Sequence, residues 1–167
     1  IEEANNVKVP IKIYKDVLRA FLLYDCRGNI GQLKADIQLL CARGFLEYKT
    51  RNRKLIEIDT PLLPEHVYNG LLKKNKNREE IFALLDYEKD YYVYKESDKF
   101  KFTTIDNYNL SGNLYNEITN KYNSYISRGY SRDKISEIIS NDIEKYIKRL
   151  LKKKNVDKEV PEKEELF

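Results

Sequence analysis

The spacing of apolar residues along the first third of the chain changes from helical to alternating. An extended lead-in reaches Val9, and residues 10–23 then follow helical spacing. A second helix is predicted to begin at Asn29, where Gln32 completes a capping pattern three residues further on. The apolar positions of the two predicted helices are Ile11, Tyr14, Leu18, Phe21 and Leu22, followed by Leu33, Ile37, Leu40 and Cys41.

The pattern predicts a β-hairpin directly after the second helix. Gly44 follows Arg43 where a helix commonly stops, because glycine adopts positive φ without strain. Residues 45–48 and 55–58 are rich in aromatic and β-branched side chains, which favours two strands. The polar segment 49–54 between them predicts a charged hairpin tip.

A similar order of elements recurs after Pro61 and Pro64. Residues 67–72 predict a third helix, Asn77 with Glu80 repeats the capping pattern of a fourth, and residues 91–94 and 100–102 alternate as a second hairpin. The recurrence suggests a structural duplication without residue identity.

The last third of the chain has helical spacing only. Gly129 is placed to end one helix, and Ser131 is placed to cap the next. An antiparallel pairing of these helices is favoured, and a second subunit on the long apolar seam is the alternative. The seam comprises Ile135, Ile139, Ile143, Ile147 and Leu150.

These elements predict an α+β protein. The expected units are a winged-helix-like unit over residues 1–60, a helix and β-hairpin unit over 61–109, a C-terminal helical hairpin over 110–156 and a charged tail over 157–167. The 167 residues include 41% hydrophobic positions, which is enough for a core. No apolar run approaches the roughly 20 residues of a membrane span, so a cytoplasmic protein is expected. The chain contains no methionine, so a piece of a longer polypeptide and a complete chain both remain open.

Few residues offer catalytic or metal chemistry. Cys26 and Cys41 are fifteen positions apart and form no C-x-x-C pair, so they are expected to be reduced core residues, with a disulfide between them as the alternative. His66 is the sole histidine, and no phosphate-binding glycine motif occurs. The sequence therefore predicts neither an enzyme nor a cofactor or metal site.

Basic residues cluster in two places. Residues 43–54 carry five basic side chains and one acidic side chain, Glu47, and a second cluster follows between Lys145 and Lys154. The net charge of +4 agrees with an anionic partner. Helix-dipole stabilisation is an alternative explanation for the second cluster.

The sequence LKADIQLLCARGFLEY, residues 33–48, resembles the passage from recognition helix to wing in winged helix-turn-helix domains, and the resemblance extends from Ile11 to Ile58. It implies that the second helix enters the major groove of DNA while the wing contacts phosphates. The implied groove-facing residues are Gln32, Lys34, Ala35 and Gln38, and the implied phosphate-binding residues are Arg43, Lys49, Arg51, Arg53 and Lys54.

Two functions follow as hypotheses. The first is binding of nucleic acid, double-stranded DNA before RNA, as a regulator or as the DNA-contacting part of a larger assembly. The alternative is a protein-docking or adaptor module of a larger ATPase or nucleic-acid machine. In either case residues 131–154 offer a surface for a homodimer or a larger complex, and no membrane partner is expected.

Overall fold

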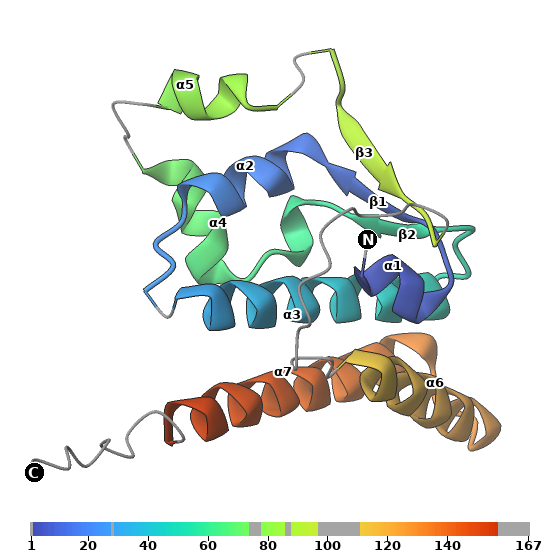
Figure 1. The fold of residues 1–167 in the computed structure, drawn as a ribbon. Helices are drawn as coiled ribbons and strands as arrows, with labels where there is room; N and C mark the ends of the chain where they lie inside the picture. Colours follow the sequence, from blue (N-terminus) through green and yellow to red (C-terminus); the bar gives the residue numbers. More distant parts are fainter. Residues whose placement is uncertain (1, 28, 74–77, 86–87, 97–110, 157–167) are drawn as a thin grey trace, which may run out of the picture.

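The computed structural model describes residues 2–27, 29–73, 78–85, 88–96 and 111–156. It confirms an α+β protein with a helical C-terminal part (Figure 1). The elements in chain order are α1 (Glu2–Val7), β1 (Ile11–Tyr14), α2 (Lys15–Leu23), α3 (Asn29–Thr50), β2 (Ile56–Ile58), the 3-10 turn η1 (Thr60–Leu62), α4 (Glu65–Leu72), α5 (Arg78–Ala83), β3 (Tyr91–Tyr94), α6 (Ser111–Ser127) and α7 (Arg132–Val156).

The small sheet joins segments that are distant in sequence. Its strand order is β2-β1-β3, with β1 parallel to β2 and antiparallel to β3. Ile11 pairs with Ile56 on one side and with Tyr94 on the other. Residues on both sides of the predicted unit boundary at position 60 therefore contribute to one sheet.

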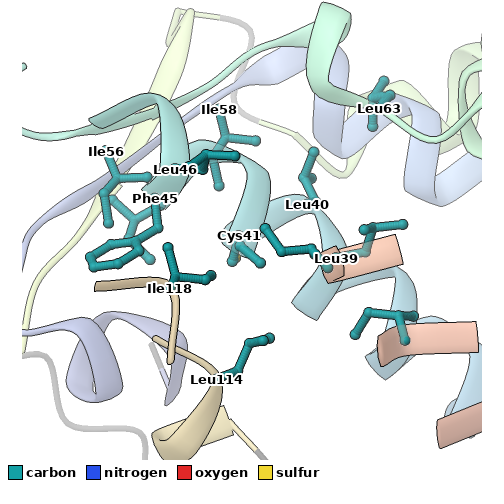
Figure 2. Packing of buried hydrophobic residues seen from close by; sticks show 14 of the residues in the cluster. Leu39, Leu40, Cys41, Phe45, Leu46, Ile56, Ile58, Leu63, Leu114 and Ile118 are labelled. Atoms are coloured by element: carbon teal, nitrogen blue, oxygen red, sulfur yellow. The ribbon is translucent and has the colours of Figure 1, made fainter. Parts of the chain in front are cut away.

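Helix α3 lies between the sheet and the α6–α7 pair (Figure 1). Figure 2 shows side chains of α3 directed both toward Ile56 and Ile58 of β2 and toward Ile118 of α6. All of these residues belong to one core cluster. A helix in this position has its apolar side chains distributed around its circumference, which explains why no single amphipathic stripe dominates α3.

The predicted hairpin over residues 45–58 is wrong, because residues 45–48 belong to α3. Phe45 and Leu46 are only 5% and 2% exposed, and their burial favours continuation of the helix over the local strand preference. The segment 56–58 is a strand as predicted, but it pairs with β1. The wing of the winged-helix comparison is therefore not formed.

Gly44 does not end the helix, although its sequence position suggested a stop. A Cβ atom on Gly44 would lie 3.1 Å from side-chain carbons of both Ile56 and Ile58, so glycine lets α3 approach β2 closely. The helix ends instead around Asn52, whose φ is 52°. The Arg53 amide donates to the Tyr48 carbonyl at 3.2 Å, as in a Schellman motif.

Two further expectations near the N-terminus are wrong. The predicted extended lead-in contains the helix α1, and residues 11–14 of the predicted first helix form β1. Helix α2 begins only at Lys15. The register that places Ile11 and Ile13 beside Ile56 and Ile58 depends on a partner strand distant in sequence, which local helical spacing does not reveal.

The C-terminal helical hairpin is confirmed. Gly129 has φ 80°, and the Ser131 hydroxyl accepts the Lys134 amide at 3.3 Å as an N-cap. Helices α6 and α7 contact each other, and α7 also packs along α3. The apolar seam is covered within the chain, as favoured from the sequence, at Ile135, Ile139, Ile143 and Ile147, which are 0%, 1%, 2% and 3% exposed.

Some predictions fall outside the described residues: the strand over residues 100–102, the tail over 157–167, and the side chains of Lys153 and Lys154. Cys26 and Cys41 are both reduced thiols, as expected. Burial raises the pKa of the Cys41 thiol well above its usual range.

Candidate nucleic-acid interface

The groove-facing residues implied by the winged-helix resemblance do not form an open surface on α3. Ala35 is buried at 6% exposure, and Gln32, Lys34 and Gln38 are each half-buried. Gln38 hydrogen-bonds Glu3 of α1, so another element of the chain engages this side chain. A helix that reads the major groove must present its polar face to the bases, and α3 does not present these residues in that way.

Helix α1 is held against α3 and α6 by a buried carboxyl group. Glu3 is 8% exposed and accepts a hydrogen bond from the Tyr115 hydroxyl of α6. Burial raises the pKa of Glu3 above the 4.5 of an exposed glutamate, although the hydrogen bonds from Tyr115 and Gln38 act in the opposite direction. This contact holds the N-terminal helix against α6.

Arg43 was predicted to bind phosphate, but it connects three parts of the fold. Its Nη1 donates to the Leu62 carbonyl of η1 at 2.9 Å, and its Nη2 donates to Glu144 of α7 at 2.7 Å. The Arg43 side chain is 20% exposed and that of Glu144 is 38% exposed. The guanidinium group therefore links α3 to the sheet layer on one side and to the long C-terminal helix on the other.

The predicted basic tip exists as a turn after α3 instead of a hairpin tip. Arg53 pairs with Glu47 at 3.4 Å and with Glu57 at 3.1 Å, and Lys49 lies over the rings of Phe45 and Tyr48. These cations have partners within the fold.

Two basic residues of the turn, Arg51 and Lys54, are exposed to solvent. The Arg51 side chain is 64% exposed and lies 3.7 Å from the Glu47 carboxylate, and Lys54 is exposed. Arg51 and Lys54 are therefore the predicted phosphate-binding residues that the fold leaves most accessible.

The turn between α6 and α7 lies beside the turn after α3. Arg132 Nη1 donates to the Thr50 carbonyl at 3.3 Å, which brings the start of α7 to the end of α3. Arg128 and Arg132 are both exposed there. We call the four residues Arg51, Lys54, Arg128 and Arg132 the basic turn surface. Arg128 and Arg132 could not be recognised from the sequence, because their approach to this turn depends on the antiparallel packing of α7 on α3.

The second basic cluster does not join this surface. Lys145 and Lys148 are exposed on α7, but Lys145 follows Arg132 by thirteen residues, or roughly 20 Å at 1.5 Å per residue. Lys145 and Lys148 therefore lie along α7 at a distance from the basic turn surface.

His66 makes a structural contact. Its Nε2 lies 2.9 Å from Oδ1 of Asp36, whose side chain is only 4% exposed, so the pair joins α4 to α3. Tyr24 lies beside the pair, with its ring centroid 6.2 Å from that of His66. Among the described residues, no group of histidine, cysteine and acidic side chains could hold a metal ion. None of the described helices is both long and apolar enough to span a membrane.

Comparison with known proteins relates the chain to parts of transcriptional regulatory proteins. It is 30% identical over 147 residues to the transcriptional regulatory protein LevR of Bacillus subtilis, which covers 88% of this chain and 16% of that protein. It is 28% identical over 155 residues to the transcriptional regulatory protein DagR of Salmonella typhimurium, covering 80% of this chain and 17% of that protein. The chain thus spans about one sixth of the length of these relatives. No known protein family matches, and no solved structure matches.

Proposed function

We propose that this chain is a docking and coupling module of a multidomain transcriptional regulator. Its similarity to LevR and DagR supports the regulatory role, and its coverage of about one sixth of each supports a module that works with other parts. The observation that carries the coupling role is the position of α3, which is packed on the sheet layer and on the α6–α7 hairpin at once.

Arg43 is the residue through which a change on one side of α3 would reach the other. Its two hydrogen bonds end on η1 and on α7, so moving α7 would remove a charge-assisted partner from the guanidinium that also holds the Leu62 carbonyl. Flanking parts of a regulator that pull on the hairpin would in this way alter the sheet layer. The proposal requires no catalytic step in this chain.

Sequence-specific reading of DNA by α3 is not part of this proposal. Ala35 is buried, Gln38 bonds Glu3 and Arg43 is engaged within the fold, so the surface that the winged-helix resemblance required is occupied by the protein itself.

A chimeric regulator tests the coupling role. The corresponding segment of LevR from Bacillus subtilis is replaced by this chain, either unchanged or with Arg43→Gln. Reporter transcription and promoter occupancy are then measured in the same cells. Arg43→Gln is expected to alter the regulation of transcription while promoter occupancy stays unchanged.

Lys121→Gln provides the matched control, because it also removes a cation from a cross-helix ion pair but leaves α3 untouched. This control is expected to regulate like the unchanged chimera. Loss of promoter occupancy in Arg43→Gln, with the remaining transcription still regulated normally, would contradict the coupling role and favour direct DNA binding.

A further inference from the structure

The basic turn surface combines two chain segments that lie about 80 positions apart. The Arg132 hydrogen bond to the Thr50 carbonyl holds the α6–α7 turn against the turn after α3. Arg51, Lys54, Arg128 and Arg132 are all exposed at this end of the molecule. Figure 1 shows why they meet: α7 runs antiparallel to α3 directly beneath it.

Two of the acidic residues near these cations, Glu47 and Glu57, are already paired. Glu47 and Glu57 both contact Arg53, and Glu57 also contacts Lys12 at 3.3 Å. The N-terminal end of α7 adds a positive helix-dipole end, against which Asp133 in the first turn of the helix is the exposed opposing charge. The surface therefore retains an excess of accessible positive charge.

We infer that the basic turn surface binds the phosphate backbone of duplex DNA. Arginine guanidinium groups match phosphate oxygens in a bidentate arrangement, and lysine contributes a point charge. The turn projects no helix and no strand ribbon that could enter a groove, so the contact carries no base readout and positions the protein on DNA. The choice of duplex DNA over other polyanions rests on the proposed function in a transcriptional regulator.

Binding through four phosphate contacts has a defined dependence on salt. The slope of log affinity against log salt is expected to be about −3.6, so affinity falls about 150-fold between 50 and 200 mM salt. Removing two of the four contacts halves the slope, and affinity then falls only about 12-fold over the same range.

Fluorescence anisotropy with a labelled duplex of about 20 base pairs tests this inference. The chain is titrated at several salt concentrations as wild type, as Arg51→Ala with Lys54→Ala, and as Arg128→Ala. The double variant is expected to lose about half of the slope and the single variant about a quarter. Circular dichroism confirms that each variant is folded.

Lys145→Ala with Lys148→Ala is the matched control for the double variant. It also removes two positive charges from exposed positions, but these lie on α7 outside the basic turn surface. Its slope is expected to equal that of the wild type. Equal loss in the control and in the Arg51 and Lys54 variant would overturn the inference, since net charge alone would then explain binding. Absence of duplex binding at 50 mM salt would also overturn it.

Measurements with other polyanions distinguish duplex DNA from other partners. Tighter binding to single-stranded DNA or RNA of the same sequence, or displacement of the duplex by polyglutamate at equal charge concentration, would each overturn the assignment to duplex DNA. Neither result bears on the coupling role, because Arg43 lies outside the basic turn surface and is tested by regulated transcription.

Discussion

The two sides of α3 are packed in different ways. On the sheet side the contact is close to the backbone, since a Cβ on Gly44 would lie 3.1 Å from side-chain carbons of Ile56 and Ile58 and would require them to shift slightly. On the other side, α7 contributes a row of isoleucine side chains and the Glu144 partner of Arg43. Packing on the sheet side is therefore favoured by glycine at position 44. Packing on the hairpin side depends on several isoleucine side chains of α7.

This difference indicates how the two layers respond to change. A close backbone approach leaves room for only small shifts of the neighbouring side chains, because interiors are packed to near-crystalline density. A side-chain seam can lose contacts one at a time. We therefore expect the α6–α7 hairpin to be the layer that can shift relative to α3, which agrees with the proposed coupling role.

The largest effect is expected from Ile143→Ala in the seam. Ile143 is 2% exposed, and truncation of a buried isoleucine typically costs about 2–5 kcal/mol of unfolding free energy because a cavity remains. Urea denaturation measures the loss. Ile126→Ala on α6, where the side chain is 42% exposed, is the control and should change stability by about 0.5 kcal/mol or less. Similar losses in both variants would mean that α7 is not packed on α3 through this seam.

A smaller loss is expected from Gly70→Ala, at the contact between α2 and α4. The added Cβ would lie 2.8 Å from the Tyr24 nitrogen and 2.9 Å from the Ala20 oxygen, and backbone atoms cannot rotate away. Overpacking of this kind costs about 1–3 kcal/mol, which thermal or urea unfolding will show.

Gly44→Ala sharpens this result. Its added Cβ meets only side-chain carbons at 3.1 Å, which can shift, and alanine gains about 1 kcal/mol of helix propensity over glycine. Gly44→Ala should therefore cost less than Gly70→Ala, and the reverse order would contradict the backbone contact described for α4.

Arg43→Gln should destabilise the fold by about 1–2 kcal/mol, because it removes a charge-assisted bond to Glu144 and leaves the Leu62 carbonyl without its donor. Lys121→Gln breaks the more exposed pair with Asp142 and should cost about 0–1 kcal/mol. Chemical denaturation of the two variants side by side makes the comparison. Equal values would show that Arg43 is no more than a surface ion pair.

The smallest effect concerns the pH dependence of Glu3. Because burial raises its pKa, the folded state binds this proton more tightly than the unfolded chain does. Its contribution to stability is full below about pH 4.5 and is lost as pH rises through the raised pKa.

Glu3→Gln keeps an acceptor for the Tyr115 hydroxyl and cannot ionise. Unfolding measured from pH 4 to pH 8 should show a smaller decline in stability for this variant than for the wild type. Parallel pH profiles would indicate that Glu3 does not titrate with a raised pKa.

Elements with local signals could be predicted from the sequence. Gly129 and Ser131 define the α6–α7 turn by positive φ and by capping, and both features are present. The end of α3 could not be predicted in this way. Gly44 is compatible with a helix stop and with close packing, and only the position of β2 decides between them.

The candidate site was partly predictable for the same reason. Arg51 and Lys54 were recognised from a dense basic segment, and both are exposed. The engagement of Arg43 could not be recognised, because its partner Glu144 lies 101 positions further along the chain. The contribution of Arg128 depends on the same long-range packing.

Native-state hydrogen exchange of the α3 amides tests the central claim most directly, namely that α3 is the interior helix joining both layers. Amides of residues 39–46 are predicted to exchange only through global unfolding, and Ile143→Ala should lower their protection and that of β2 by the same free energy. Exchange of these α3 amides at a lower free energy than β2, with β2 protection unchanged in Ile143→Ala, would contradict the account.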